Sequence, residues 1–267
     1  AAVRQAKPDA IMHFAAATVV PESVEDPLLY FEVNTVGSHY LISAAIAAGV
    51  PRFVFSSTAA AYGDVDAEVL TEQMPTNPIS PYGRSKVMVE QMLQWHQQRY
   101  HLNVAIFRYF NVAGATGIRG EDHRPETHLI PVALLAALGK RDGLTVFGAD
   151  YPTPDGTCIR DYVHVADLAD AHVLAADWLT DNGWGLFNLG TTSGTSVQQV
   201  IHAVEGVTDR TLPVTIGPRR EGDPARLIAS AEKARTVLGW EPKRSTVEQM
   251  VGSAWDWMQH HPDGYAD

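Results

Sequence analysis

The residues with the clearest capacity for chemistry are a tyrosine and a lysine four positions apart, Tyr82 and Lys86, together with the hydroxyl group of Thr58. On a helix this spacing places both side chains on one face, so the ammonium group can lie beside the phenol. A nearby cation favours the phenolate, lowers the pKa of the phenol from about 10 and makes the tyrosine a usable base. The Thr58 hydroxyl could hydrogen-bond the same reacting oxygen. Because this spacing also arises by chance on surface helices, the surrounding elements decide its meaning.

Those elements form an alternating pattern of strands and helices. Apolar runs predict strands at Ile11–Phe14, Arg52–Ser56 and Val104–Tyr109, and helical patterns connect them at Pro27–Ala48 and Tyr82–Tyr100. Such alternation indicates right-handed crossovers and a parallel sheet. The hydroxyl groups that follow the second strand and the tyrosine that opens the second helix both lie outside the carboxyl ends of the strands. Parallel sheets bind their ligands there.

The second half of the chain predicts a smaller lobe that is interleaved with this sheet. After Asn111 the sequence turns to loops rich in glycine, proline and charge. We expect an α/β fold, a Rossmann-like doubly wound parallel sheet, with residues 1–111 and 161–190 in one lobe and 112–160 and 191–267 in the other. The further predicted elements are strands at Leu144–Phe147 and Leu186–Leu189 and helices at Leu129–Leu138, Val165–Leu179, Ser196–Glu205, Ala231–Leu238 and Val247–Gln259, the last with a capping box of Ser245 and Glu248.

The composition is that of an acidic globular protein. The 267 residues include 31 Asp and Glu against 20 Lys and Arg, a formal net charge of −11 at pH 7, which argues against nucleic acid as a partner. The single cysteine, Cys158, cannot form an internal disulfide, and no apolar run approaches the ~18 residues that cross a bilayer. We expect a cytoplasmic protein without a membrane partner, in which Cys158 is a small buried residue.

Nearly the whole chain resembles the extended short-chain dehydrogenase/reductases, and among them the members that epimerise UDP-sugars at C4. The matching stretches are HFAAATVVPESVEDPL (His13–Leu28), FVFSSTAAAYGD (Phe53–Asp64), SPYGRSK (Ser80–Lys86), RYFNVAGA (Arg108–Ala115), GEDHRPETHLIP (Gly120–Pro131), VFGADYPTPDGTCIRDYVHVADLADAH (Val146–His172) and RREGDPA (Arg219–Ala225). Motifs such as DGTxxRDYxHVxDLAxAH and RREGD are too specific to arise by chance.

The resemblance implies an isomerase of galactose metabolism that uses NAD and interconverts UDP-glucose and UDP-galactose through a 4-keto intermediate. By similarity, Tyr82 takes the proton of the sugar 4′-hydroxyl and Thr58 orients that oxygen. Lys86 would hold the nicotinamide ribose and lower the pKa of Tyr82. The resemblance also implies a homodimer, formed by the two long helices at Pro27–Ala48 and Tyr82–Tyr100.

The resemblance assigns binding roles to further residues. The cofactor positions, besides Tyr82 and Lys86, are Phe14, Ala15, Ala16, Thr18, Asn34, Ser56 and Tyr109. The substrate positions, besides Thr58 and Tyr82, are Ala59, Asn111, His128, Leu129, Thr145, Val146, Phe147, Arg160, Arg220, Asp223 and Leu227. Asn111 would contact the phosphate region, Arg160 and Arg220 the diphosphate and Asp223 the uridine ribose, while Val146 and Phe147 would flank the uracil. Planar guanidinium groups suit phosphate oxygens.

Four departures from the family pattern bear on function. Thr18 stands where many members have Lys near the cofactor phosphates, and His128 lies in Thr-His-Leu where many have Asn-Asn-Leu. Leu227 is intermediate in size at the pocket wall, which leaves N-acetylated sugars open. The family's glycine-rich, pyrophosphate-binding turn is not found ahead of Ile11, so we expect the chain as given to bind NAD poorly and to be a truncated form. The glycine triplet from Gly114 to Gly120 precedes an acidic, proline-broken segment and is interpreted as a loop.

Other classes are less well supported. A hydrolase would need a G-x-S-x-G elbow, which does not occur, and a metalloenzyme would need more than His123 and His128, which lack a third partner in the sequence pattern. Ala59 and Ala60 follow Thr58 where the related dehydratases carry Asp-Glu. A UDP-N-acetylglucosamine or UDP-glucuronate 4-epimerase, a UDP-glucuronate decarboxylase and a non-catalytic nucleotide-sugar-binding relative remain alternatives.

Overall fold

Four parallel strands form the main sheet of the protein. A computed structural model describes residues 1–65, 67–220 and 223–265. The strands lie in the order β1-β2-β3-β8, and their bounds are Ala10–His13, Arg52–Thr58, Asn103–Tyr109 and Trp184–Leu189. All pairs are parallel, with Phe55 of β2 opposite Ile106 of β3, which in turn lies opposite Leu186 of β8. The central strands are buried almost throughout, as expected of a parallel sheet covered on both faces.

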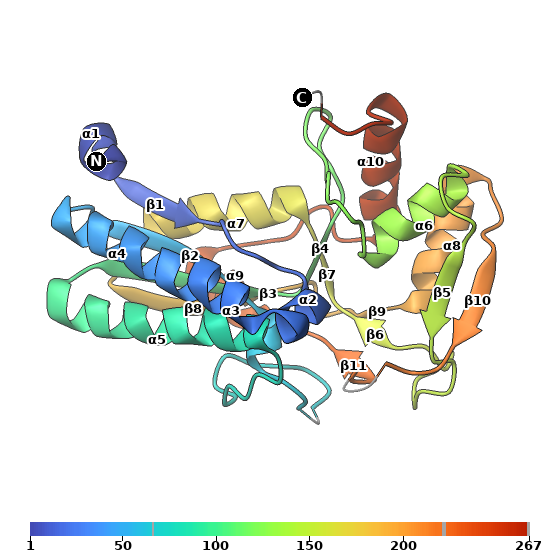
Figure 1. Cartoon of the computed structure of the whole chain (residues 1–267), viewed down its shortest axis with the longest axis horizontal. Helices are drawn as coiled ribbons and strands as arrows, with labels where there is room; N and C mark the ends of the chain where they lie inside the picture. The colour runs from blue at the N-terminus through green and yellow to red at the C-terminus, as the bar shows by residue number, and fades with distance from the viewer. Residues whose placement is uncertain (66, 221–222, 266–267) are drawn as a thin grey trace.

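Helices cover both faces of this sheet (Figure 1). Phe53 and Phe55 pack with one set of helices, whereas Val54 packs with another, because alternate side chains of a strand point to opposite faces. The first set is α4 (Gly37–Ala47) and α5 (Pro81–Tyr100), and the second is α7 (Val165–Trp178) and α9 (Glu232–Leu238). The doubly wound α/β class is thereby confirmed.

The helix predicted at Pro27–Ala48 is helical over its length but changes its winding. It begins as α3 (Pro27–Tyr30), continues as the π-helical segment η1 (Phe31–Val36) and ends as α4. Gly49 follows it with a φ of 71°, the left-handed conformation that commonly terminates helices. Single π-helical turns inside α-helices often occur at functional sites, and Asn34 lies in this one.

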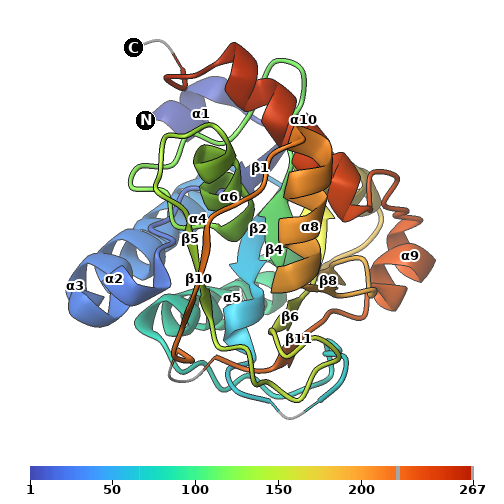
Figure 2. The ribbon, with the colours of Figure 1, turned by 90° about the vertical axis from the view of Figure 1, so that its right-hand side faces the viewer.

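The second part of the molecule is built from short strand pairs and three helices (Figure 2). The parallel pairs are β5 (Leu144–Phe147) with β10 (Val214–Gly217), β6 (Ile159–Arg160) with β11 (Arg226–Leu227) and β4 (Asn111–Ala113) with β7 (Tyr162–His164), and β9 (Thr195–Ser196) adds to β6 in the antiparallel sense. The helices α6 (Leu129–Ala137), α8 (Val197–Thr208) and α10 (Val247–His260) share one apolar core. The remaining elements are α1 (Ala2–Ala6), α2 (Val20–Glu25) and the 3₁₀ turn η2 (Ala59–Ala61).

The capping box predicted for the last helix is wrong by one residue. Thr246, and not Ser245, is the N-cap of α10: its hydroxyl accepts the N–H of Gln249, and the Gln249 side chain accepts the N–H of Thr246, each at 3.2 Å. Both candidate pairs have the required spacing, so burial of the helix's apolar face decides the register. No described helix is long and apolar enough to cross a membrane.

Candidate active site

The start of α5 is fixed against the end of β2. Ser80 caps the helix by accepting the N–H of Gly83 at 3.2 Å. Gly83 is required for close packing, since a Cβ atom there would lie 2.6 Å from the carbonyl oxygen of Ala60. This approach brings Tyr82, in the first turn of α5, to Thr58 at the end of β2, and their hydroxyl groups hydrogen-bond. The structure thus brings together two of the three predicted catalytic groups.

Lys86 lies one turn further along α5 and is buried. Its Nζ donates to the carbonyl oxygen of Ser56 at 2.9 Å and lies 5.0 Å from the centre of the Phe55 ring. Burial lowers its pKa to about 8, against the opposing effect of the Glu90 carboxylate. Burial raises the pKa of Tyr82, and the interaction with Thr58 offsets this rise only in part.

Two further tyrosines border the Tyr82 phenol. The ring of Tyr30 meets that of Tyr82 edge-on, with centroids 6.3 Å apart at 87°. Tyr109, at the end of β3, has a pKa raised to about 12 by burial. Beside it lies the buried hydroxyl of Ser56, which interacts with the Tyr109 hydroxyl and makes no other hydrogen bond within the described part of the chain. A buried hydroxyl with unused hydrogen-bonding capacity is costly, so this edge of the sheet suits a polar ligand.

The loop after β1 is held in place by Asn34. The Asn34 side chain accepts the N–H of Ala17 at 2.8 Å, donates to the Ala17 carbonyl at 3.0 Å and donates to the Ser85 hydroxyl at 3.1 Å. Asn34 therefore positions the loop and is itself buried. Phe14 is 52% exposed, and its ring centre lies 4.7 Å from that of His172, so Phe14 is not a core residue. Of the other predicted cofactor residues in this loop, Ala15 and Thr18 are exposed and Ala16 is half-buried.

A second cluster of predicted residues lies on the small sheets. Arg160 forms an ion pair with Asp223, and Leu227 lies in register with Arg160 on the neighbouring strand. The guanidinium carbon of Arg220 lies 4.0 Å from the centre of the Phe147 ring. The N–H of Asp223 donates to the Arg220 carbonyl at 3.3 Å, which joins the two pairs. Between them, Glu221 and Gly222 of the RREGD motif lie outside the described residues.

The remaining predicted substrate residues differ in how well they are placed. Asn111 joins this region through its N–H, which donates to the Asp161 carbonyl at 3.0 Å. Thr145 is exposed on β5, but Val146 is 2% exposed and packs in the core. Its side chain therefore cannot flank a base as expected, because neighbouring residues of a strand face opposite ways and Phe147, like Thr145, points outward while Val146 points inward. Ala59 is buried in a small apolar cluster, and the side chain of Leu227 packs against that cluster. Leu129 is half-buried and packs against the core of the second part.

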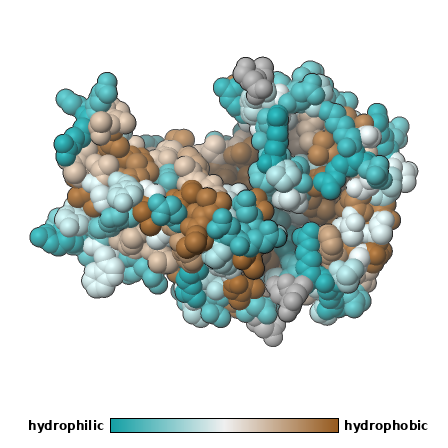
Figure 3. Space-filling view, in the orientation of Figure 1, coloured by the Kyte–Doolittle hydropathy of each residue, from teal (hydrophilic) through white to brown (hydrophobic). Residues whose placement is uncertain are grey.

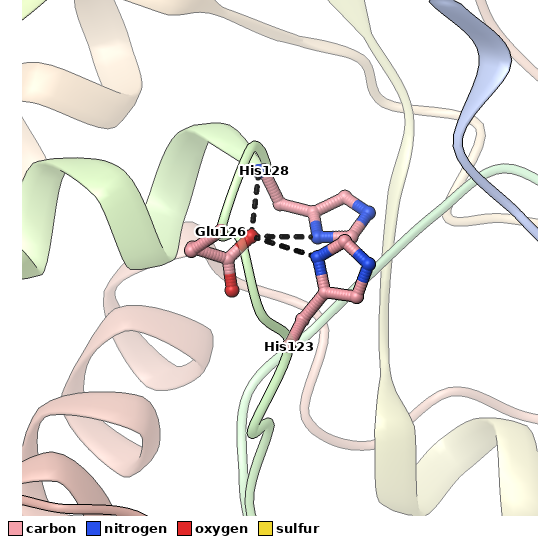
Figure 4. A group of neighbouring side chains, drawn as sticks. All are labelled: His123, Glu126 and His128. Carbon is pink, nitrogen blue, oxygen red and sulfur yellow. Dashed lines mark hydrogen bonds and ion pairs between the residues drawn. The ribbon is translucent and has the colours of Figure 1, made fainter. Parts of the chain in front are cut away.

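His123, Glu126 and His128 lie together in the loop before α6, with both imidazole rings pointing to the carboxylate (Figure 4). Nδ1 of His128 lies 2.9 Å from Oε1 of Glu126, and Nδ1 of His123 lies 3.8 Å from the same oxygen. The expectation that the two histidines lack a third partner is therefore wrong. Spacing could not show Glu126 as that partner, because the loop path decides which side chains meet. The same oxygen also accepts the N–H groups of Thr127 and His128, so hydrogen bonds already occupy it.

His128 is a cation in this arrangement. Its Nδ1 also lies 2.8 Å from Oε1 of Glu121, and hydrogen bonds with Glu121 and Glu126 raise its pKa to about 10. His128 is the N-cap residue of α6, where the first N–H groups of the helix carry partial positive charge. The start of α6 therefore carries a cation that the Glu121 and Glu126 carboxylates already balance.

Many known proteins are similar to this chain, and curated UDP-glucose 4-epimerases are among them. A UDP-glucose 4-epimerase of Halalkalibacterium halodurans is 50% identical over 97% of this chain and 78% of its own length. The solved UDP-Glc/GlcNAc 4-epimerase of Campylobacter jejuni is 44% identical, with a TM-score of 0.85 over 97% of this chain and 80% of that one. The UDP-glucose 4-epimerase of Bifidobacterium longum, solved with NAD+ and UDP, is 37% identical, with a TM-score of 0.91 over 98% of this chain and 80% of that one.

The fold and the site define a nucleotide-binding α/β protein, with a tyrosine–threonine pair at the ligand edge of its sheet, one arginine on the short strand β6 and another between β10 and β11. The family model that matches residues 1–190 gives the class its name: the chain belongs to the NAD dependent epimerase/dehydratase family. The resemblance inferred from the sequence motifs is confirmed.

Proposed function

We propose that this chain carries the NAD-dependent 4-epimerisation of UDP-glucose and UDP-galactose. The observation that carries the proposal is the Tyr82–Thr58 hydroxyl pair, which lies at the end of β2 in a chain 50% identical to a UDP-glucose 4-epimerase. Ala59 and Ala60 follow Thr58, so the acid–base pair expected of a dehydratase is not next to this pair. Retention of Tyr82 and Lys86 argues against a non-catalytic relative.

The residues at this edge fit a dinucleotide. The buried Ser56 hydroxyl makes no hydrogen bond with a described residue besides its interaction with Tyr109, and the half-exposed Phe14 offers an apolar face to a ring. The groups that we assign to cofactor binding are Phe14, Ala15, Ala16, Thr18, Asn34, Ser56, Tyr82, Lys86 and Tyr109. NAD, when bound, supplies the oxidation of sugar C4 and the return of hydride to it.

The chain's own groups handle the proton and the orientation of the sugar. Tyr82 takes the proton from the 4′-hydroxyl and returns it, and Thr58 hydrogen-bonds the 4′-oxygen. Lys86 holds the nicotinamide ribose, and its positive charge favours the phenolate of Tyr82. The burial that raises the pKa of Tyr82 in this structure is then opposed by the ammonium group and the cationic ring together.

The small sheets bind the nucleotide. Arg160 and Arg220 take the diphosphate, Asp223 the uridine ribose, and Phe147 packs against the uracil. His128 contributes positive charge at the start of α6. This division supports a cofactor lobe of residues 1–111 and 161–190 and a nucleotide-sugar lobe of 112–160 and 191–267. The molecular surface is hollowed between the part with α4 and the part with α6 (Figure 3).

The chain also has the surface of a homodimer. Large apolar side chains are exposed on α3 and α5, with Leu28 81% and Trp95 72% exposed. Apolar residues gather over the α2–α4 region of the surface (Figure 3). We assign this face to a second copy of the chain. We place the protein in the cytoplasm, because its single cysteine is a buried free thiol.

The test is conversion of UDP-galactose to UDP-glucose with NAD supplied. The chain spans 78% of the length of the Halalkalibacterium halodurans relative, and the assay uses the chain joined to the part of that relative that the match leaves out. We expect conversion by the joined protein. If UDP binds but no sugar is converted, the epimerase proposal is wrong and a nucleotide-sugar-binding role replaces it.

The same assay with UDP-N-acetylgalactosamine tests a second candidate substrate. Leu227 lies half-buried on β11 beside Ala59, and leucine leaves more room than the tyrosine that would exclude an N-acetyl group. The Campylobacter jejuni relative is a UDP-Glc/GlcNAc 4-epimerase. We expect Leu227→Tyr to reduce conversion of the N-acetylated sugar and to leave conversion of UDP-galactose in place.

A further inference from the structure

A buried carboxylate, Glu90, joins three elements of the candidate active site. Glu90 accepts the Ser57 hydroxyl on Oε1, and Arg108 binds both of its oxygens, Nε to Oε1 at 3.0 Å and Nη2 to Oε2 at 2.5 Å. Glu90 is 7% exposed, Arg108 4% and Ser57 1%. The three residues lie on α5, β3 and β2, so one carboxylate links all three elements.

Each member of this group is next to a residue of the site. Ser57 lies between Ser56, whose carbonyl accepts from Lys86, and Thr58. Arg108 lies opposite Ser57 in the sheet register, just as Tyr109 lies opposite Thr58. Glu90 is one helical turn after Lys86 and two turns after Tyr82, on the same face of α5. The group therefore fixes the helix that carries the base against the strand that carries the threonine.

The network continues from Arg108 away from the site, and each polar group along it has a partner within the protein. The guanidinium carbon of Arg108 lies 4.8 Å from the centre of the Tyr62 ring, and the Tyr62 hydroxyl donates to Asn188 of β8 at 2.6 Å. The Asn188 side chain donates in turn to the Leu70 carbonyl at 3.0 Å. Apolar residues of similar volume often replace a buried ion pair with no loss of stability. A contribution to the stability of the fold is therefore a poor explanation for the buried Glu90–Arg108 ion pair.

We propose that Glu90 is a positioning residue for the proposed reaction: with Arg108 and Ser57 it sets α5, the helix that carries Tyr82 and Lys86, against β2 and β3. The inference rests on the proposed function and adds a role that the sequence motif does not include. The only sequence signal is spacing, since Glu90 falls four residues after Lys86.

The electrostatic surroundings of Lys86 support this role. Among the described residues, the charged and titratable groups that interact with it are Glu90 on its own helix and His13 on β1, and Tyr82 lies one turn earlier on α5. Burial and the Lys86 ammonium lower the pKa of His13 to about 4, so His13 is neutral and offers no counter-charge. Glu90 raises the pKa of Lys86 against the effect of burial, and the cation of Lys86 is lost above about pH 8.

The test compares the wild type with the double variant Glu90→Leu/Arg108→Met, which removes both charges together and leaves neither unpaired in the core. The titration midpoint of Lys86 is measured by NMR on lysine labelled with ¹³C at Cε, with Lys86→Arg to assign the signal. We expect the midpoint to fall by about one pH unit, which corresponds to a tenfold change in the protonation equilibrium. In the epimerase assay the alkaline limb should shift equally and kcat should fall about fivefold at pH 8, the loss of protonated Lys86 that a one-unit shift from about pH 8 produces, with KM for UDP-galactose unchanged.

The control is Asp167→Asn, which removes a buried carboxylate paired with Arg244 at 2.6 Å on α7. We expect it to lower the melting temperature without moving the Lys86 midpoint. A Lys86 midpoint and pH profile that stay at wild-type values in a folded double variant would overturn the proposal. The NMR titration needs no turnover, so an inactive wild type would count against the proposed reaction, whereas an unmoved midpoint would count against Glu90.

Discussion

At the scale of single residues, Arg220 and Phe147 form the contact on which nucleotide recognition depends. The guanidinium carbon lies over the exposed ring, 4.0 Å from its centre, and the group is not tied to a carboxylate in any described ion pair. We expect Arg220→Ala to weaken UDP binding by about 10- to 100-fold, since hydrogen bonds to charged groups contribute about 1.5–3 kcal/mol. Isothermal titration calorimetry with UDP measures this directly.

The neighbouring Arg219 is the matched control. It pairs with Asp150 at 2.7 Å and packs over Tyr151 at 4.3 Å, so its charge is already used within the protein. We expect Arg219→Ala to change UDP affinity by less than about threefold, as exposed ion pairs contribute little. Equal losses in the two variants would show that general positive charge, and not the position of Arg220, determines binding.

At the scale of elements, the π-helical segment η1 holds the loop that follows β1. Asn34 makes three hydrogen bonds from this segment, two to Ala17 and one to Ser85. We expect Asn34→Ala to lower the free energy of unfolding by about 1–3 kcal/mol, because it leaves buried polar groups unpaired. Denaturant unfolding measures the loss, and hydrogen exchange at the Ala17 amide should become faster.

Asn34→Asp separates the two sides of this contact. Aspartate keeps the acceptor for the Ala17 N–H but loses the donors to the Ala17 carbonyl and the Ser85 hydroxyl. We expect hydrogen exchange at the Ala17 amide to be slower in Asn34→Asp than in Asn34→Ala. Asn34→Asp should still have a lower free energy of unfolding than the wild type. Unchanged exchange at Ala17 in both variants would mean that Asn34 does not hold the loop.

The long elements could be predicted from the sequence, whereas several details could not. The strands of the main sheet and the helices that cover it follow from apolar periodicity, which persists over many residues. The strands β6, β9 and β11 have two residues each, so no periodicity exists to reveal them. Their pairing depends on contacts between distant segments. The cap of α10 was misplaced because two neighbouring hydroxyl residues satisfy the same rule.

The site could be predicted in part for similar reasons. Tyr82 and Thr58 meet as expected, because helix spacing and the end of a parallel strand fix their positions. The buried side chain of Val146 could have been found from strand alternation, since Phe147 beside it must face the other way. The contact of Glu126 with His128 depends on the path of a loop, and the direction in which the Tyr82 pKa shifts depends on burial. A sequence motif contains neither kind of information.

At the scale of the whole molecule, the apolar face of α3 and α5 predicts a dimer. Leu28 and Trp95 are among the most exposed large apolar side chains of the described residues. We expect Leu28→Asp with Trp95→Asp to convert a dimer to a monomer in analytical ultracentrifugation, because burial of two carboxylates at an apolar interface is costly. Val173→Asp, on α7 and 58% exposed, should leave the dimer intact. A wild-type monomer at micromolar concentration would contradict the assignment.

The most direct test of the account is the effect of Tyr82→Phe on UDP-galactose conversion in the joined protein, with UDP affinity measured alongside. Phenylalanine keeps the ring that meets Tyr30 and removes only the hydroxyl that bonds with Thr58. The account predicts a loss of kcat of about 10²- to 10⁴-fold with UDP affinity unchanged. Undiminished turnover would contradict the assignment of Tyr82 as the base.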